Sequence, residues 1–356
     1  MSRPDTFRRL LNERFGWRLD EADVERLATY FFRGPAQFAA LEEIVLPAIA
    51  ARRSPGTIRI LSAGCASGEE PYSIAIAALC SLRPLPPIEI LGIDVSPRAI
   101  ERARANRYAP WTLRGTPADV IGEYFESIGG DFALVPAAAA LARFAEWDLL
   151  AAGCPPGPWD VVFFRNISMF FTTEAARSVI ASLAANMAPG AHLLLGLSEN
   201  LRGLSDAFVL RHTHGAFYYE LREVPPEGGD LATVFALLAK GRVDEARDAA
   251  ECVLAADGTS AGACYALALC DEDAGRIAAA VLHDEMAIHL DPMFSLPHLH
   301  LGVMARTRGD AEAARAHMRM ARQLLMREDG SRPLFYRGVV EREALLRLCD
   351  AATSRG

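Results

Sequence analysis

The fold of this chain is indicated by the stretch ILSAGCASGEEPYS, which covers residues 60–73. Its apolar start is typical of a strand, the small residues Gly64, Ala66 and Gly68 form a tight turn, and a helix is expected from Glu69. A strand that passes through such a turn into a helix places backbone close to a ligand. The free N–H groups of the helix N-terminus also face that ligand.

Strand and helix patterns alternate outward from this stretch. Strands are expected over residues 57–61, 88–93, 142–146, 159–164 and 192–197, and helices over 69–82, 97–106 and 174–187. This alternation predicts an α/β fold with a doubly wound, mainly parallel sheet. Residues 207–211 and 216–221 flank His212-Thr213-His214-Gly215 and predict a hairpin, so that the sheet ends in an antiparallel pair.

Four segments are expected along the chain. A helical segment covers residues 1–50, with Asp20 capping a helix, and the α/β domain covers 51–223. The breaker cluster VPPEGG at 224–229 then marks a boundary. Helical repeats follow over 230–326, with a helical tail over 327–356.

The repeats are indicated by spacing. Gly241, Gly275 and Gly309 recur every 34 residues (275−241 and 309−275), and an alanine stands five positions after each glycine. Val253, Ala287 and Ala321 keep the same register. The period and the mid-repeat turn resemble the tetratricopeptide repeat, in which neighbouring units stack to bury a shared core. A generic alanine-rich helical bundle is the alternative.

The composition argues against several classes of function. A net charge of −8 argues against nucleic acid as the main partner, because phosphate binding needs a basic face. The seven scattered cysteines contain no Cys-x-x-Cys pair, and the eight histidines show no metal-ligand pattern, so no metal site is expected. Neither a signal peptide nor a long apolar run is present. We therefore expect a cytoplasmic protein without direct membrane insertion.

Polar residues at predicted strand ends suggest a cofactor site. Two acids, Glu69 and Glu70, follow the glycine turn; they would repel a pyrophosphate but suit a cation such as S-adenosylmethionine. Asp94 ends the second strand, where an acid typically binds a ribose diol, and Asp148 can accept from an adenine amino group. As alternatives, the two glutamates serve only the helix dipole, Asp94 or Ser96 caps the next helix, and Asp148 is an ordinary loop acid.

Two further constellations are ambiguous on spacing alone. The buried strand 159–164 runs into Arg165-Asn166, where open α/β sheets place ligands, although Arg165 also suits a structural ion pair. The run Thr29-Tyr30-Phe31-Phe32-Arg33 favours a helix that packs its apolar face.

Together these stretches resemble a known family. The blocks FFR (31–33), GCASGEEPYS (64–73), GID (92–94), RN (165–166) and SEN (198–200) occur in this order, and over residues 29–221 the chain resembles the CheR-type chemoreceptor protein-glutamate O-methyltransferases. Some family members carry tetratricopeptide tails. The resemblance implies a class I methyltransferase-like domain that uses S-adenosylmethionine and releases S-adenosylhomocysteine. The implied methyl acceptor is a chemoreceptor or another signalling protein, and the repeats would recruit a partner protein.

The resemblance also implies roles by position. Arg33 would lie near the transferred methyl and the acceptor carboxylate, as the catalytic residue. The predicted cofactor-binding residues are Thr29, Arg33, Gly64, Ala66, Glu69, Asp94, Asp148, Leu149, Arg165 and Asn166.

The chain departs from many relatives at Phe170, which replaces a tyrosine, and at Asp148, where asparagine is frequent. Its lead-in before Thr29 is also short. These departures leave an alternative, a catalytically weak cofactor-binding regulator or scaffold that acts through its repeats. A small-molecule methyltransferase also remains open, whereas the two glutamates disfavour a nicotinamide-dependent dehydrogenase.

Overall fold

The computed structural model describes residues 29–53, 56–222, 230–327, 335–336, 338 and 341–353. The helix expected at Asp20 lies outside these residues. The chain divides into two compact units. The first comprises Met1–Glu199 with Arg211–Glu223, and the second comprises Asn200–Leu210 with Val224–Gly356.

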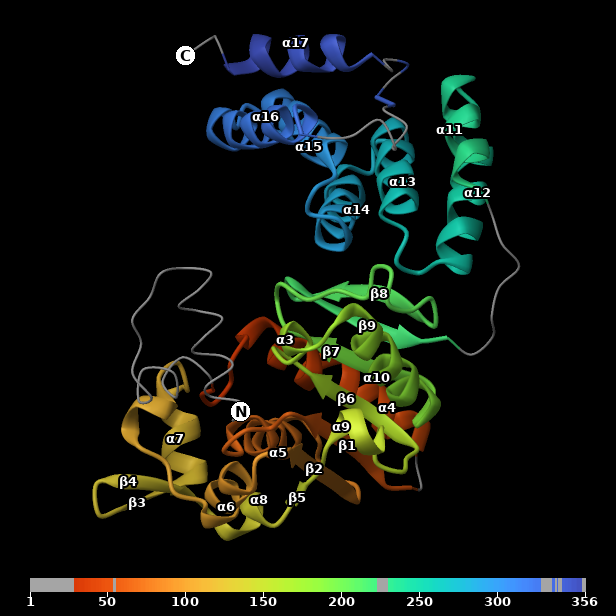
Figure 1. Cartoon of the computed structure of the whole chain (residues 1–356). Helices are drawn as coiled ribbons and strands as arrows, with labels where there is room; N and C mark the ends of the chain where they lie inside the picture. Colours follow the sequence, from red (N-terminus) through yellow and green to blue (C-terminus); the bar gives the residue numbers. More distant parts are fainter. Residues whose placement is uncertain are drawn as a thin grey trace. The chain divides into compact units, whose positions relative to one another are not determined.

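The first unit is built on the sheet drawn in Figure 1, in which the described residues form seven strands in the order β5-β2-β1-β6-β7-β9-β8. Strands β5, β2, β1, β6 and β7 run parallel, and β9 pairs antiparallel with β7. The predicted doubly wound, mainly parallel sheet is therefore confirmed. The strands are β1 Ile58–Ala63, β2 Ile88–Asp94, β5 Ala142–Glu146, β6 Trp159–Phe164, β7 Met187–Leu195, β8 Phe208–Thr213 and β9 Ala216–Leu221.

Helices follow the strands much as expected. Helix α5 directly follows the β1 turn, α6 follows β2, and α10 lies between β6 and β7. The helical segments of this unit are α3 Pro35–Ala40, η1 Leu41–Val45, α4 Leu46–Arg53, α5 Glu69–Ser81, α6 Pro97–Ala105, η2 Pro110–Leu113, α7 Ala118–Tyr124, α8 Pro136–Ala139, α9 Leu149–Ala152, η3 Ser168–Phe170 and α10 Thr173–Ala185.

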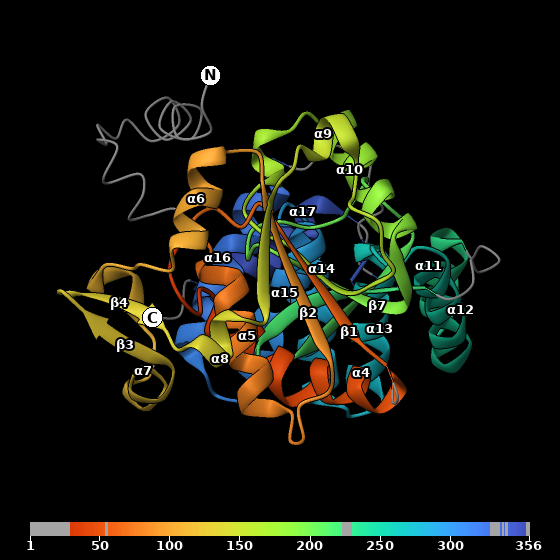
Figure 2. The same cartoon turned by 90° about the horizontal axis from the view of Figure 1, so that it is seen from below.

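Two regions differ from the sequence expectation. Residues 29–34 form turns rather than a helix, because Phe32 and Gly34 take positive φ angles of 54° and 83°. Strands β3 (Phe125–Ile128) and β4 (Asp131–Leu134) form a separate antiparallel pair that the sequence analysis did not predict. Figures 1 and 2 both show this pair with α7 at the periphery of the unit, away from the main sheet.

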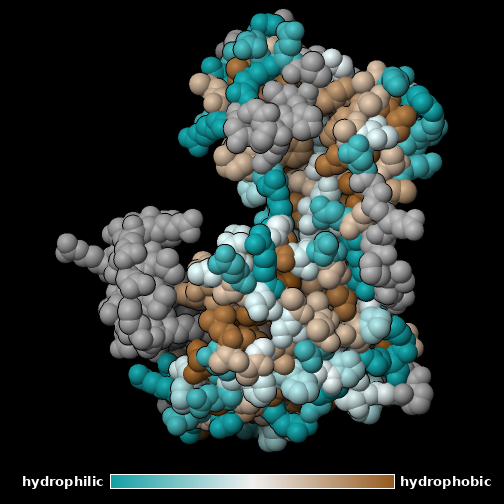
Figure 3. All heavy atoms as spheres, turned by 45° about the vertical axis from the view of Figure 1, so that its right-hand side comes forward, coloured by the Kyte–Doolittle hydropathy of each residue, from teal (hydrophilic) through white to brown (hydrophobic). Residues whose placement is uncertain are grey.

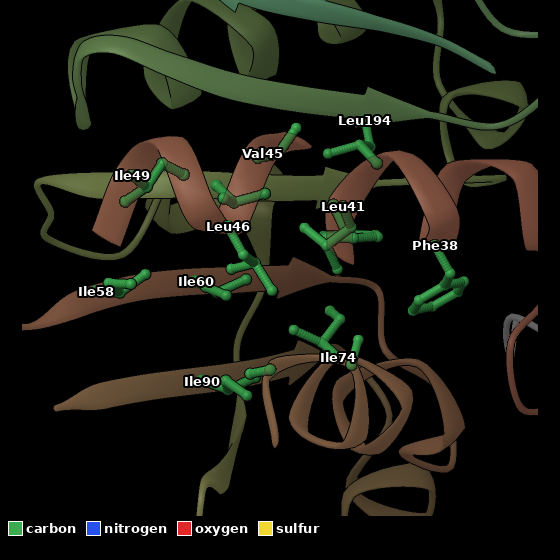
Figure 4. Close-up of a cluster of buried hydrophobic side chains, with 14 of the residues drawn as sticks. Phe38, Leu41, Val45, Leu46, Ile49, Ile58, Ile60, Ile74, Ile90 and Leu194 are labelled. Carbon is green, nitrogen blue, oxygen red and sulfur yellow. The ribbon is translucent and has the colours of Figure 1, made fainter. Parts of the chain in front are cut away.

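The burial of the core residues agrees with the strand order. All six residues of β6 are buried, as a strand between two neighbours and two covered faces requires. Figure 4 shows Ile58 and Ile60 of β1 and Ile90 of β2 packed against Ile74 of α5 and Leu46 of α4. The apolar runs of the sequence thus bury one continuous core, which holds the strand ends in fixed positions.

The second unit is helical and repeats its geometry. The turn glycines Gly241, Gly275 and Gly309 have φ angles of 71°, 72° and 81°, and each lies in the turn between two helices. The predicted 34-residue register is therefore present in three successive helix pairs; the tetratricopeptide assignment itself stays a prediction. The helices are α11 Leu231–Ala239, α12 Val243–Ala256, α13 Ala261–Asp273, α14 Ile277–Leu290, α15 Ser295–Thr307, α16 Ala311–Leu325 and α17 Arg342–Thr353.

The small residues of the repeat have a packing role. Ala246, Ala280 and Ala314 are all buried. The backbone N–H of each donates to the carbonyl oxygen of the residue that follows the turn glycine of the same repeat. Within the described part of the chain, no helix combines the length and the apolar character that crossing a bilayer requires.

Gly68 provides a test of the turn before α5. Its φ is 96°, and a Cβ atom there would lie 2.8 Å from Cβ of Ala103 and 2.9 Å from Oη of Tyr108. We expect Gly68→Ala to lower the free energy of unfolding by about 2–4 kcal/mol, from backbone strain plus overpacking. Urea unfolding followed by tryptophan fluorescence measures this, because all four tryptophans lie within residues 17–159.

Gly115→Ala is the matched control. Its φ is similar, 87°, but a Cβ atom there meets nothing within 4 Å, so only the backbone cost of about 1 kcal/mol is expected. Equal losses in the two variants would contradict the proposed packing of the turn.

Candidate functional site

The turn after β1 is joined to the end of β2. Gly64 and Cys65 donate their N–H groups to the Ile93 carbonyl oxygen at 2.8 and 2.9 Å, and Ala66 N–H donates to Asp94 Oδ2 at 3.0 Å. Gly64, Ala66 and Gly68 all have positive φ angles. The backbone therefore folds tightly at the carboxyl edge of the sheet, as the sequence predicted.

Asp94 is buried within this junction. Its other oxygen, Oδ1, accepts from Ser96 N–H at 3.0 Å, while the Ser96 hydroxyl accepts from Ala99 N–H and caps α6. The helix cap considered in the sequence analysis is thus made by Ser96. The role of Asp94 at a ribose stays a prediction.

Glu69 is a buried carboxylate at the start of α5. Its two oxygens accept from the Ser67 hydroxyl at 3.0 and 2.8 Å, and the Thr29 side chain also hydrogen bonds to it. Burial raises the pKa of Glu69, although its backbone, Ser67, the charge of Arg102 and Thr29 act in the opposite direction. The structure brings Thr29 and Glu69 together, and their arrangement favours a cationic ligand.

Glu70, the neighbouring acid, has a different partner. Its Oε2 pairs with Nη1 of Arg165 at 3.1 Å, and its Oε1 accepts from the Ser62 hydroxyl at 2.7 Å. The Arg165 side chain is only 4% exposed, and its Nη2 donates to the Arg33 carbonyl oxygen. The structure therefore contains the ion pair that the sequence analysis weighed for Arg165, and this pair holds the Arg33 segment against β6.

Arg33 is half-buried at the same edge. Burial lowers the pKa of Arg33, and the charge of Arg165 lowers it further, yet a guanidinium remains protonated in proteins. The preceding Phe31 is fully buried among Tyr108 and Phe125, with ring centroids 4.9 Å apart in both pairs. The aromatic side chain thus anchors the segment that carries Arg33.

A carboxylate that the sequence analysis left without a role organises the loop after β6. Glu199 Oε2 accepts from the N–H groups of Asn166 and Gly196, both at 2.7 Å. Its Oε1 accepts from Ser168 N–H at 3.1 Å and from the Ser168 hydroxyl at 2.5 Å. These four bonds hold Asn166 in a left-handed conformation, with φ 59°. The Ser-Glu-Asn block was the only sequence signal for this residue.

The last two predicted residues, Asp148 and Leu149, follow β5. Asp148 Oδ1 accepts from the N–H groups of Leu150 and Ala151 and so caps α9. Leu149 is 9% exposed, whereas Leu150, which was not predicted, is 57% exposed. Leu150 rather than Leu149 therefore presents an apolar side chain at this edge.

Leu150 belongs to a set of exposed apolar residues at one edge. On the face drawn in Figure 3, apolar residues reach the surface in groups with polar residues between them. Four exposed large side chains closely follow the carboxyl ends of parallel strands: Val95 after β2, Leu150 after β5, Met169 after β6 and Leu197 after β7. The edge that carries the acids thus also offers apolar contact surface.

All ten predicted residues lie at this edge or on the segment beside it. Thr29 and Arg33 come from the lead-in, Asp94 ends β2, and the others follow β1, β5 and β6. Their contact with a cofactor stays a prediction. Among the described residues, no group of three or more His, Cys, Asp or Glu side chains has the geometry to hold a metal ion.

The chain matches a known family over the residues that form this edge. The family described as "CheR methyltransferase, SAM binding domain" matches residues 28–216. The chain belongs to this family. It is therefore an S-adenosylmethionine-dependent methyltransferase, and the cofactor expected from the sequence is confirmed. The acid-lined edge fits that cofactor chemically, because Glu69 is a buried carboxylate suited to a cation.

Two relatives show how far the likeness extends. A chemotaxis protein methyltransferase of Vibrio parahaemolyticus is 33% identical over 200 residues, which are 54% of this chain and 72% of the relative. The probable biofilm formation methyltransferase WspC of Pseudomonas aeruginosa is 28% identical over 350 residues, with 83% of each chain covered. The likeness to the second relative thus extends beyond the CheR methyltransferase domain into the helical unit.

The role of Glu199 can be tested through Asn166. We expect Glu199→Gln to weaken binding of S-adenosylhomocysteine about tenfold, because the new amide turns an NH₂ group toward two of the four donors. Isothermal calorimetry measures the affinity. In the double variant Glu199→Gln/Asn166→Ala the loss should not exceed that of Asn166→Ala alone.

Glu220→Gln is the control, because this residue makes an exposed ion pair with Arg211 and should leave the affinity unchanged. Additive losses at Glu199 and Asn166 would show that Glu199 does not act through Asn166.

The raised pKa of Glu69 predicts a pH effect on cofactor binding. A cationic ligand favours the ionised carboxylate, so affinity is full above the raised pKa and falls as pH decreases through it. The fall begins above the usual carboxyl value of about 4.3. Calorimetry with S-adenosylhomocysteine at several pH values from about 7.5 down to about 4.3 measures this effect.

Glu69→Gln should bind more weakly and lose this pH dependence, whereas Glu89→Gln at the opposite strand end should keep it. An affinity of the unaltered chain that is constant over this range would exclude the role of Glu69.

Proposed function

We propose that this chain transfers the methyl group of S-adenosylmethionine to glutamate carboxylates of a chemoreceptor-type signalling protein. The observation that carries the proposal is the placement of Arg33, which the Glu70–Arg165 ion pair holds at the acid-lined edge of the sheet. A guanidinium offers two parallel donors to one carboxylate. The names of the relatives, a chemotaxis methyltransferase and a biofilm formation methyltransferase, support an acceptor in a signalling pathway.

In this proposal, different residues at the edge bind different groups of the cofactor. Glu69 and Thr29 receive the ammonium group, Asp94 the ribose and Asp148 the adenine amino group, while Gly64, Ala66 and Asn166 supply backbone and amide contacts. Leu149 and Arg165 complete the set by position. The exposed side chains of Val95 and Leu150 add apolar contact for a planar base. The bound cofactor supplies a methyl group activated by a sulfonium.

The chain's own residues then act by alignment. An acceptor glutamate, with a pKa near about 4.3, is already ionised at neutral pH and needs no general base. With the cofactor bound, a carboxylate oxygen would bond to its methyl carbon, and the electron pair of the broken carbon–sulfur bond would remain on sulfur. Arg33 orients the carboxylate, and the exposed apolar side chains after the strand ends, including Met169 and Leu197, exclude water from the reacting groups.

Arg33 must bind the acceptor carboxylate with only moderate strength. The carboxylate loses its charge during transfer, so a guanidinium that binds the ground state tightly raises the barrier. Its half-buried position, with a pKa lowered by burial and by Arg165, suits a moderate interaction.

A regulator that binds the cofactor with little catalysis is the second candidate. Phe170, half-buried on η3, favours it because this ring lacks the hydroxyl that many relatives carry at the position. In either case we propose that the helical unit binds a partner protein, that nucleic acid is not a partner, and that the chain acts in the cytoplasm without membrane insertion.

Methyl transfer decides between the candidates. We expect the chain, incubated with radiolabelled S-adenosylmethionine and receptor cytoplasmic fragments, to deposit a base-labile label on glutamates. Arg33→Ala should lower turnover about 100-fold while calorimetry shows S-adenosylhomocysteine affinity changed less than about threefold.

Arg211→Ala, which removes an exposed arginine remote in sequence from the site motifs, is the control and should leave both values unchanged. Equal losses of turnover and affinity in Arg33→Ala would refute the orienting role. Cofactor binding without label on any receptor fragment would favour the regulator.

A further inference from the structure

One dipeptide touches the first helix of every pair in the helical unit. The ring of Phe335 lies 5.8 Å from the ring of Phe235 on α11, and the Phe335 carbonyl oxygen accepts from the Tyr265 hydroxyl on α13 at 2.9 Å. The ring of Tyr336 lies 6.0 Å from the ring of His300 on α15. Two adjacent residues thus span three successive repeats.

The contacts resemble those by which repeat proteins bind peptides. Phe335 and Tyr336 are buried, at 7% and 4% exposure, although they lie outside the helices themselves. Tyr265 hydrogen bonds to main chain, which any extended segment offers, whereas the aromatic contacts depend on the side chains. Stacked repeats present the side chains of successive helices along one extended surface.

The side chain next to the second aromatic residue belongs to a charged cluster. His300 is fully buried, with Nδ1 2.7 Å from Asp284 Oδ2 and Nε2 3.0 Å from Glu272 Oε2. Burial alone lowers its pKa, but the two carboxylates outweigh burial and raise the pKa of His300 to about 9. A protonated imidazole beside the Tyr336 ring favours an aromatic neighbour.

We propose that Phe235, Tyr265 and His300 form a peptide-binding groove for an extended pair of aromatic residues. The chain's own Phe335-Tyr336 fills this groove and competes with a partner segment of the same chemistry. The inference rests on the proposed role of the helical unit in partner binding, and it names the chemistry of that partner. Because the internal pair is tethered, it acts at a high effective concentration, which a partner must overcome.

The test uses the full chain and a labelled peptide of its own residues 331–338, SRPLFYRG. We expect the double variant Phe335→Ala/Tyr336→Ala to bind this peptide, as measured by fluorescence anisotropy, at least about tenfold more tightly than the unaltered chain. A peptide with alanine at both aromatic positions should bind neither protein. A folded double variant that does not bind SRPLFYRG overturns the proposal.

Phe294→Ala is the matched control. This buried ring contacts Tyr265, with centroids 5.3 Å apart, so its removal also leaves a space in the same unit while the internal dipeptide stays in place. We expect lower thermal stability without peptide binding. If this variant binds the peptide as tightly as the double variant does, then the peptide binds to a loosened core and not to a vacated groove. That result would overturn the proposal.

Tyr265→Phe keeps the inference testable if the double variant fails to fold. It removes only the hydroxyl that donates to the Phe335 carbonyl. We expect faster amide hydrogen exchange around Phe335 and Tyr336 with unchanged protection of α13 and α15; unchanged exchange at the dipeptide overturns the proposal.

Peptide binding and hydrogen exchange are measured without cofactor or methyl acceptor. A failure of methyl transfer therefore leaves both readouts intact, and a failure of peptide binding leaves the proposed methyl transfer intact.

Discussion

The candidate site depends on one ion pair, which joins a buried guanidinium to a half-buried carboxylate. Glu70 and Arg165 are brought together from the start of α5 and the end of β6, and Arg165 in turn donates to the carbonyl of Arg33. A buried charge is tolerated only when it is paired and hydrogen bonded. Arg165 is buried and Glu70 is half-buried, so removing Glu70 leaves an uncompensated buried guanidinium at a cost of about 3–5 kcal/mol. The pair therefore joins the lead-in segment to the sheet and sets the position of Arg33.

The acids at the carboxyl edge have different functions because their surroundings differ. Glu70 neutralises Arg165, and Glu199 is saturated by four donors that shape the loop of Asn166. Glu69 lies next to Glu70 in sequence, but among the described residues its contacts are hydroxyl and backbone hydrogen bonds and the charge of Arg102, without an ion pair like that of Glu70. A buried carboxylate without a close cationic partner is the group that gains most from a bound cation. The same type of residue thus provides both the scaffold and the ligand site.

The helical unit uses regularity where the α/β unit uses specific ion pairs. Its glycine turns repeat the same backbone geometry, and buried alanines let paired helices approach closely. One departure from this regularity is the cluster around His300, Tyr265 and the dipeptide 335–336, where aromatic and charged groups pack together. That local departure from the repeat pattern is what points to recognition rather than to packing alone.

The sequence by itself determined the parallel sheet, the helix order and the 34-residue register, because apolar runs and turn glycines specify local backbone and burial. It also located the site motifs, but not strands β3 and β4, whose short segments on either side of Gly129-Gly130 bury few residues. Only the tertiary structure decided that Glu70 rather than Glu69 pairs with Arg165, that Glu199 holds Asn166 and that Phe335 meets Tyr265. These pairs join residues far apart in the chain, so their geometry depends on how the whole core packs.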